Sequence, residues 1–221
     1  MAYVLESGIR FCETSGRLVF LDVPRDRYVC LEEGAEAAFR QTILQGALTR
    51  EDPALEALVR QGIVARADRP QSPQRPPDIA PVERSALERA ASIKPSRTSV
   101  LQAGMAVLAA RYSLRRKGLA QTLEALARRS IVEEADTSKT DKITGIAAAF
   151  ARLDLYLSPS GQCLPRSIAI ASVLARQSIS ARLVIAVRLR PFLAHSWVQA
   201  GSLVVNDRPD VVRTFSPILV I

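Results

Sequence analysis

The stretch GQCLPRSIAIASVLARQSISARLVIAVRL, residues 161–189, changes its hydrophobic period near the middle. Its first half supplies four apolar side chains for one side of a helix: Ile168, Ala171, Val173 and Leu174. This spacing predicts a helix over residues 163–177, and Pro165 suits its first turn, where a missing N–H costs no hydrogen bond. From residue 182 the apolar residues alternate instead: Leu183, Ile185, Val187 and Leu189. The stretch therefore predicts a helix followed by a strand.

The flanking sequence extends both patterns. Upstream, three sets of apolar residues have helical spacing: Val100, Ala103, Val107 and Leu108, then Leu119, Leu123 and Leu126, and finally Ile143, Ile146, Phe150 and Leu153. They predict three helices, with a break at Lys117-Gly118 between the first two. Downstream, residues 196–200 and 203–206 are β-prone and flank Gly201-Ser202, which predicts a hairpin. Helices followed by antiparallel strands make an α+β domain.

Prolines are concentrated before this domain. Residues 69–82, RPQSPQRPPDIAPV, contain five of the chain's 13 prolines. Proline fixes φ and lacks a backbone donor, so this stretch favours a semi-rigid extended linker over a helix or a central strand. The linker divides the chain into a small first domain, residues 1–68, and a larger second domain, residues 83–221.

The first domain begins with short β-prone runs separated by turn-forming residues. Residues 3–11, 17–23 and 28–31 predict a small antiparallel meander. Helical spacing follows over residues 35–44 and 53–61, and a closing strand is expected at 63–65. Strands followed by helices in this order predict a winged-helix-type module.

The composition is that of a globular protein. Of the 221 residues, 48% are hydrophobic and 24% are charged, which is an ordinary globular balance. No apolar run reaches the roughly 18 residues that a membrane span needs. The opening segment MAYVLESGIR holds Glu6 and Arg10 where a signal peptide needs an unbroken apolar run. We therefore expect a cytoplasmic protein with no membrane partner.

Cofactor and metal motifs are missing from the sequence. Its 3 cysteines form no CxxC motif and no cluster with the histidine, so neither a disulfide scaffold nor a zinc site is expected. Neither GxxxxGK[ST] nor GxGxxG occurs. We therefore expect no nucleotide site and no cofactor in this chain.

The charge balance is strongly basic. Lys and Arg outnumber Asp and Glu by 30 to 22, which gives a net charge of +8. Such a balance favours an anionic partner, although scattered arginines also suit a merely solvated surface. A basic winged-helix protein that binds nucleic acid is therefore an alternative hypothesis. Against it, the predicted helix at 53–61 carries only Arg60 as a basic residue.

Three residues of the second domain suit nucleophilic catalysis. Cys163 lies where a loop enters a helix, whose free N–H groups favour a thiolate and can hold an oxyanion. His195 begins a strand and Asp207 ends the next one, so a hairpin brings both to the same end. A thiol, an imidazole and a carboxylate in this order of contact predict a nucleophile, its base and the group that orients the base. The alternative is a buried structural cysteine and a structural histidine.

Three other residues are assigned to packing. Cys12 and Cys30 lie in strands of the first domain, which has no histidine. Trp197 is in phase with His195 along its strand and either covers the site or fills the core. Core filling is the favoured interpretation.

Three motifs of the second domain occur together. Cys-Leu-Pro-Arg-Ser at 163–167 opens the helix, Pro-Phe-Leu-Ala-His-Ser-Trp-Val spans 191–198, and Val-Asn-Asp follows at 205–207. In this combination the chain resembles the lasso peptide biosynthesis B proteins, which are transglutaminase-like cysteine peptidases with a papain-like site. It departs from their pattern at Ser196, where alanine is commoner. The resemblance implies a catalytic triad of Cys163, His195 and Asp207.

The first domain adds two shorter motifs, RFC at 10–12 and LDVPRDRY at 21–28. They resemble the precursor-recognition domain of winged-helix, PqqD-like fold that accompanies these peptidases. The resemblance implies that the first domain captures the leader of a ribosomally made precursor as an added β-strand, while the second domain cuts leader from core. The residues expected to bind the leader are Tyr28, Val29, Leu31, Leu55 and Leu58.

The same resemblance implies two partners. One is the precursor peptide, held by its leader. The other is an asparagine-synthetase-like macrolactam cyclase, which uses ATP to close the ring after cleavage. No nucleic acid is expected as a partner on this interpretation. A remaining alternative keeps the thiol site but transfers the acyl group to an amine instead of to water.

Overall fold

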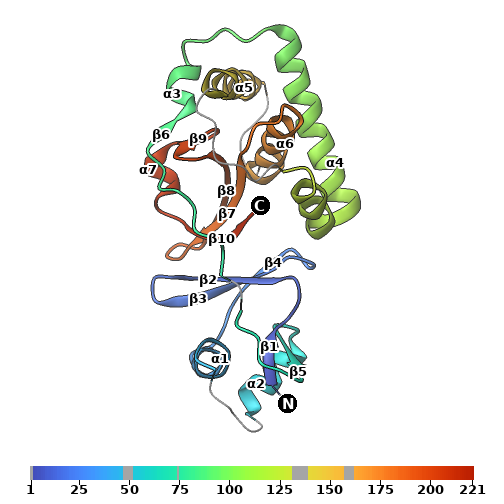
Figure 1. Ribbon diagram of the computed structural model, residues 1–221, viewed down its shortest axis with the longest axis vertical. Coiled ribbons are helices and arrows are strands. Elements are labelled where there is room, and N and C mark those ends of the chain that lie inside the picture. The colour runs from blue at the N-terminus through green and yellow to red at the C-terminus, as the bar shows by residue number, and fades with distance from the viewer. Residues whose placement is uncertain (1, 47–51, 74, 131–138, 157–161) are drawn as a thin grey trace. The chain divides into compact units, whose positions relative to one another are not determined.

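The computed structural model describes residues 2–46, 52–73, 75–130, 139–156 and 162–221. Its internal contacts divide the chain into two units, Met1–Pro76 and Pro77–Ile221. The division falls inside the proline-rich stretch. The model is a mixed α+β structure, as the sequence predicts (Figure 1).

The first unit contains a meander of three antiparallel strands, in the order β2-β3-β4. They are β2 (Ile9–Thr14), β3 (Arg17–Asp22) and β4 (Arg27–Cys30). A separate strand, β1 (Ala2–Leu5), pairs with β5 (Val64–Ala67) in another sheet.

The prediction of one strand over residues 3–11 is wrong, because the chain turns at Gly8. This glycine has a φ of +82°, and a Cβ there would lie 2.8 Å from Cγ of Pro24. Only glycine fits such a position without strain. The turn sends the two halves of the predicted strand into different sheets.

Two helical segments cover one face of the meander. They are α1 (Glu33–Phe39), which continues into a π-helical turn, η1 (Arg40–Leu44), and α2 (Pro53–Arg60). Asp52 caps α2 by accepting a 2.8 Å hydrogen bond from the amide of Ala54, which satisfies one free N–H group at the helix start.

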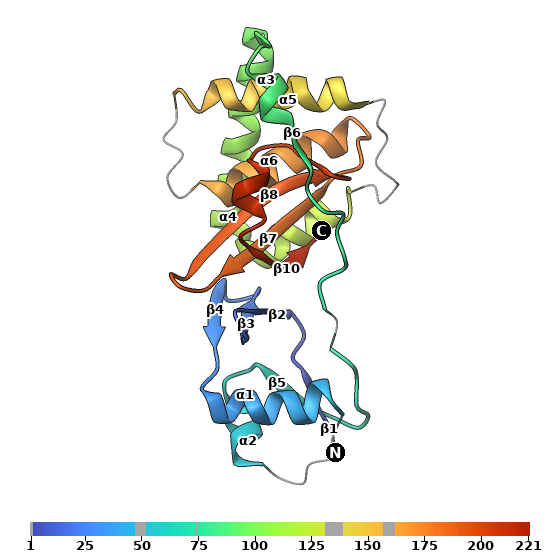
Figure 2. The same cartoon turned by 90° about the vertical axis from the view of Figure 1, so that its left-hand side faces the viewer.

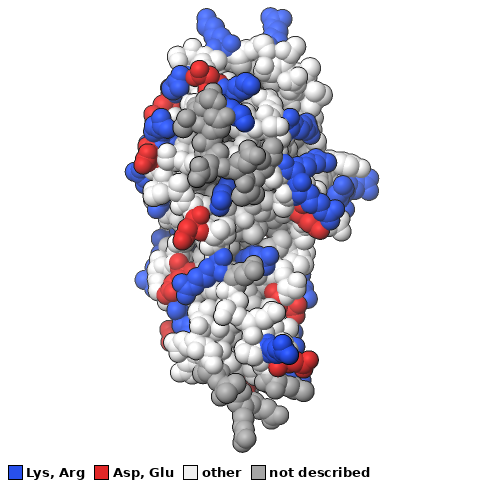
Figure 3. Space-filling view, in the orientation of Figure 1, with Lys and Arg blue, Asp and Glu red and all other residues white. Residues whose placement is uncertain are grey.

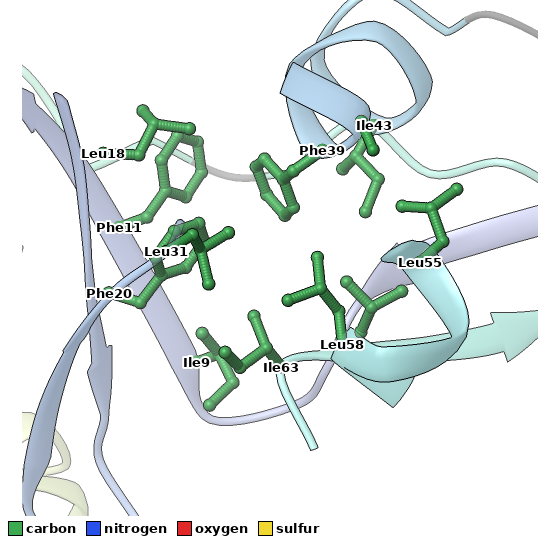
Figure 4. Close-up of a cluster of buried hydrophobic side chains, with 12 residues drawn as sticks. Ile9, Phe11, Leu18, Phe20, Leu31, Phe39, Ile43, Leu55, Leu58 and Ile63 are labelled. Atoms are coloured by element: carbon green, nitrogen blue, oxygen red, sulfur yellow. The ribbon is translucent and has the colours of Figure 1, made fainter. Parts of the chain in front are cut away.

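Aromatic and aliphatic side chains from these elements form the core of the first unit (Figure 4). The ring of Phe39 meets the rings of Phe11 and Phe20 edge-on, at centroid distances of 5.9 and 4.9 Å. Leu55 and Leu58 of α2 close the other side of the core and are fully buried. Burial of each large side chain contributes about 1.5–3 kcal/mol.

The second unit is helical through most of its first half. The helices are α3 (Ala86–Ala90), α4 (Arg97–Ala127), α5 (Thr140–Leu153) and α6 (Cys163–Arg176). The predicted break at Lys117-Gly118 is confirmed as a kink inside α4, where Gly118 has a φ of 75° and a ψ of 179°. Leu108 was expected to face inward, but it is 61% exposed.

A five-stranded sheet in the order β10-β7-β8-β9-β6 completes this unit. Its strands are β6 (Arg84–Ser85), β7 (Arg182–Arg188), β8 (Leu193–Ala200), β9 (Leu203–Val204) and β10 (Ser216–Val220). A short helix, α7 (Pro209–Val212), precedes β10. The sequence pattern does not predict β6, α7 or β10, because such short elements show little hydrophobic periodicity.

Both faces of the sheet are covered. Helix α6 packs between strand β8 and helix α4 on one side, and α7 lies on the other (Figures 1 and 2). A second core fills that other side: Val82, Val184, Ala186, Trp197, Val204 and Val212. Residues 183–187 of β7 are consequently all buried, although the alternating pattern predicted burial on one face only. Trp197 fills the core, as expected.

The last residues of the proline-rich stretch pack against the sheet. Val82 is buried in the second core. The backbone oxygen of Ala80 accepts a 2.6 Å hydrogen bond from the side chain of Gln199, and that of Val82 accepts one of 3.0 Å from Arg213. This end of the stretch is therefore part of the second unit.

Within the described ranges, no helix is both long and apolar enough to cross a membrane.

Candidate active site

Cys163 is the first residue of α6, and no side chain caps this helix at Gln162. The free N–H groups of the first turn therefore point toward the end of the helix where the thiol lies. The backbone N–H of Leu164 donates a hydrogen bond to the sulfur. The start of α6 thus provides a positive electrostatic environment for a thiolate.

His195 and Asp207 are brought together by the predicted hairpin. Strands β8 and β9 pair with Gln199 opposite Val204, and the amide of Val205 continues the ladder by donating to the oxygen of Val198 at 2.8 Å. Two residues further on, Oδ2 of Asp207 lies 2.5 Å from Nε2 of His195. The hydroxyl of Ser85 holds the backbone of Asp207 by donating to its carbonyl oxygen at 2.6 Å.

The three predicted residues converge on one pocket. The side chains of Cys163 and His195 share a hydrogen bond. Together with Asp207 they line a pocket of about 190 Å³, whose opposite wall comes from α4 and α5. The order of contact is thiol, imidazole, carboxylate, as the sequence predicts.

The electrostatics of the pocket favour an ion pair between thiolate and imidazolium. Burial raises the pKa of the Cys163 thiol, but hydrogen bonds from His195, Ser196 and the helix start outweigh it and hold that pKa below its usual value. The hydrogen bond to Asp207, followed by that to Cys163, raises the pKa of His195 to about 9. The two shifts reinforce each other, because each charge stabilises its neighbour.

A buried polar network fixes the helix start against the strands. The hydroxyl of Ser167 donates to the backbone oxygen of Ser196 at 3.0 Å and accepts from Nδ2 of Asn206 at 3.1 Å. Oδ1 of Asn206 in turn accepts from the amide of Val198 at 2.8 Å. The network fixes the position of Cys163 relative to His195, because it joins helix α6 to strand β8.

The sequence interpretation did not assign a role to Ser196. Its hydroxyl donates to Oγ of Ser167 at 3.4 Å, and its backbone oxygen accepts from Ser167. The departure from alanine at this position therefore adds a hydroxyl that also helps to lower the pKa of the Cys163 thiol. In the sequence, the signal that indicates a role for Ser196 is its position directly after His195.

Aromatic rings enclose one side of the imidazole. The ring of Phe215 lies 5.2 Å from that of His195, and the ring of Trp197 lies 6.2 Å away. The guanidinium of Arg188 lies over Phe215 at 5.2 Å. These rings limit the access of water to the pair of His195 and Asp207.

An ion pair that the sequence does not predict also lines the pocket. Nη1 of Arg166 lies 2.5 Å from Oδ2 of Asp154, and both residues line the pocket. Arg166 follows Cys163 by three residues, so the two share one face of α6. Burial raises the pKa of Asp154, while Arg166 opposes the shift. The spacing of three residues from the cysteine could have indicated Arg166.

The two other cysteines, Cys12 and Cys30, belong to the first unit and do not line this pocket. Cys12 is buried, and its burial, followed by the effect of Cys30, raises the pKa of its thiol to about 12. Cys30 is exposed at the end of β4, which corrects the expectation that it packs in the core. Among the described residues no cluster of histidine, cysteine and acidic side chains could hold a metal ion.

The predicted leader-binding residues divide into two groups. Leu31, Leu55 and Leu58 belong to the core of the first unit and are at most 4% exposed. A bound peptide cannot touch them while the core is closed, which corrects the expectation that they contact a leader. Tyr28 and Val29 lie on β4, an outer strand of the meander, and stay candidates.

Comparison with known proteins places the second unit in a family. The model of the transglutaminase-like superfamily matches residues 104–220. The microcin J25-processing protein McjB of Escherichia coli is 47% identical over 49 residues, which are 22% of this chain and 24% of that protein. The match thus spans about a quarter of the relative's length. No solved structure matches the chain.

The superfamily match includes Cys163 and His195. Together with the similarity to McjB it confirms the resemblance to the lasso peptide biosynthesis B proteins. The superfamily match covers more than half of the chain. On the strength of that coverage, the chain belongs to the transglutaminase-like superfamily.

Proposed function

We propose that the chain is a cysteine peptidase that binds a ribosomally synthesised lasso precursor peptide by its leader and cleaves leader from core before the macrolactam forms. The observation that carries this proposal is the convergence of Cys163, His195 and Asp207 on one pocket. The similar protein from Escherichia coli is named as a processing protein, which supports a peptide substrate.

In the first step the Cys163 thiolate attacks the carbonyl carbon of the scissile bond, and a carbon–sulfur bond forms. The N–H groups at the start of α6 are suited to stabilise the resulting oxyanion. His195 then transfers its proton to the leaving nitrogen as the carbon–nitrogen bond breaks. The core departs with a free amine, while the leader stays on Cys163 as a thioester.

In the second step water resolves the thioester. His195, now neutral, takes a proton from water as the oxygen attacks the thioester carbon. The carbon–sulfur bond breaks, the leader leaves with a new carboxyl group, and the ion pair of thiolate and imidazolium is restored. Asp207 stabilises the imidazolium at both stages and fixes the orientation of the ring.

The outer strand β4 of the first unit suits a role in leader binding. An outer strand has backbone groups that can pair with an added peptide strand. Tyr28 and Val29 would lie along the added strand. Binding the leader to one unit would raise the concentration of the scissile bond near the other. The macrolactam cyclase would act on the released core.

Intact-mass analysis of the precursor peptide encoded beside the gene tests this function. Wild type, Cys163→Ala and the control Asp210→Asn, which alters an exposed carboxylate paired with Arg208, are each incubated with the peptide, with and without a cyclase. We expect wild type and Asp210→Asn to cut one bond, and Cys163→Ala to bind the leader without cutting. Cleavage by Cys163→Ala at the wild-type rate would overturn the proposal.

Acyl transfer to an amine is a second candidate, which the match to the transglutaminase-like superfamily favours. It would use the same thioester, with an amine in place of water. The mass of the leader fragment separates the two, because hydrolysis adds water and transfer adds the amine. The test uses the same samples with a small primary amine added.

A further inference from the structure

Helix α4 has an exposed apolar stripe with no partner among the described residues. Four large side chains, each more than half exposed, form this stripe: Leu101 at 65%, Met105 at 53%, Leu108 at 61% and Tyr112 at 63%. Their spacing of four, three and four residues places them on one line along the helix. We call them the α4 seam.

The seam lies on the opposite side of α4 from the face that packs against the rest of the second unit. Ala103, Ala106, Val107 and Ala110 are buried, and α4 packs against α5 and α6. At 3.6 residues per turn these four residues lie on the other side of the helix from the seam. The first part of α4 is thus apolar on two opposite faces, and its own fold covers only one of them.

The charges beside the seam are all positive. From Arg89 to Gln121 the sequence contains seven Lys or Arg residues and no Asp or Glu. Arg97 and Arg115 lie along one side of the seam, and Arg116 lies along the other, with its guanidinium 5.7 Å from the ring of Tyr112. Figure 3 shows Lys and Arg side chains gathered on the side of the molecule where α4 lies.

We propose that the α4 seam docks an amphipathic α-helix of a partner protein, whose apolar stripe packs on the seam and whose flanking positions are acidic. The spacing of the seam is that of a two-helix packing interface. Charge selects the partner, because acidic side chains at the flanking positions would pair with Arg97, Arg115 and Arg116.

Two other occupants fit the seam less well. A second copy of this chain would bring two basic margins together, which repel each other. A membrane surface favours a broad apolar face, whereas this stripe is narrow and exposed Gln102 borders it. Sedimentation and vesicle binding distinguish these two occupants from a partner helix.

The probe is a synthetic helical peptide of about four heptads, with Leu at the core positions and Glu at the flanking positions. Its like charges keep it from pairing with itself. Binding of the labelled peptide to the full-length protein is measured by fluorescence anisotropy. We expect Met105→Ala with Leu108→Ala to weaken binding by about tenfold or more. The control Gln102→Ala, also exposed on α4, should leave binding unchanged.

A charge exchange tests the chemistry of the partner. Arg97→Glu with Arg115→Glu should weaken binding of the Glu-flanked peptide and strengthen binding of the same peptide with Lys at its flanks. Equal binding of both peptides by wild type would overturn the proposal. So would a wild-type dimer that the seam variant dissociates in sedimentation, or binding to anionic vesicles that the seam variant loses.

Discussion

The carboxylate of Asp207 and the imidazole of His195 lie 2.5 Å apart, although 12 residues separate them in sequence. The pairing of β8 with β9 produces this contact, because it folds the chain back between the two residues. Since Asp207 occupies Nε2, the remaining ring nitrogen, Nδ1, is the one available to Cys163. The imidazole can therefore hold a proton between a thiolate and a carboxylate.

The pH dependence of cleavage should follow from this arrangement. The active form needs Cys163 ionised and His195 protonated, so kcat/KM should rise as the thiol ionises and fall as His195 loses its proton near pH 9. The acid limb should lie below the usual pKa of a thiol, since that pKa is lowered here. Initial rates of precursor cleavage across the pH range measure both limbs. A rate that rises steadily through pH 9 to 10 would contradict the assignment.

Replacing Asp207 by asparagine should remove the charge that stabilises the imidazolium while keeping the shape of the side chain. We expect the alkaline limb to move to lower pH, because the hydrogen bond to Asp207 is the largest cause of the raised pKa of His195. We also expect kcat to fall by about 10²–10⁴. Asp210→Asn, which alters an exposed carboxylate paired with Arg208, serves as the matched control. Equal loss in both variants would indicate a general structural effect.

Ser196→Ala should raise the pKa of the Cys163 thiol, because it removes a hydroxyl that lowers this pKa. The rate of alkylation by iodoacetamide against pH reports this pKa, since only the thiolate reacts. A background of Cys30→Ser removes the exposed competing thiol. An unchanged pH profile in the variant would show that the hydroxyl does not support the thiolate.

Glu36 should stabilise the first unit in a pH-dependent way. Its carboxylate is buried, accepts hydrogen bonds from Arg17 and Arg40, and accepts one of 3.1 Å from the amide of Leu18. Burial alone would raise the pKa of Glu36, but these bonds outweigh it and lower that pKa. The contribution should therefore be complete above the unfolded pKa of about 4.3 and be lost as the pH falls through the folded value.

The variant Glu36→Gln tests this at pH 7. It should lower the free energy of unfolding of the first unit by about 1–3 kcal/mol, because it weakens charged hydrogen bonds to a buried group. Hydrogen exchange of the peptide covering β3 gives a local measure that does not depend on the second unit. Glu13→Gln is the control, since Glu13 also pairs with Arg40 but is about half exposed. Similar exchange in the two variants would count against a special role for Glu36.

The turn at Gly8 should tolerate no side chain. Gly8→Ala combines a positive φ with a contact of 2.8 Å between the new Cβ and Pro24, so we expect a loss of about 1–3 kcal/mol. Gly16→Ala has a similar φ of +75° and nothing within 4 Å of the new atom. It should cost less, because only the backbone strain remains. Thermal unfolding followed by circular dichroism compares the stability of the two variants. An equal loss of stability would show that the contact with Pro24 adds nothing to the backbone strain.

The sequence predicts the elements that carry strong local signals. The period change at residues 161–189 correctly gives α6 and β7, and the turn at Gly201-Ser202 gives the pairing behind the contact between His195 and Asp207. Elements that depend on distant partners were missed. Strand β6 has two residues and exists because it pairs with β9 across 119 positions of sequence, which leaves no local pattern to detect.

The candidate site divides in the same way. Cys163, His195 and Asp207 are recognisable from residue type and position, because their chemistry limits the choice. Ser196 and Arg166 carry only a positional signal, next to His195 and three residues after Cys163. The pairing of Arg166 with Asp154 has no such signal, because it depends on which side chains meet in space. Leu108 was placed in the core by its period, since an apolar stripe that faces a partner has the same spacing as one that faces the core.

Mass spectrometry of an acid-quenched reaction can detect the thioester on Cys163 itself. Wild-type protein is mixed with the precursor peptide, quenched early and analysed for a covalent adduct. We expect an adduct equal to the leader less one water, located on the peptide that contains Cys163 and missing from Cys163→Ala. Precursor cleavage without any adduct, together with undiminished cleavage by Cys163→Ala, would contradict this expectation.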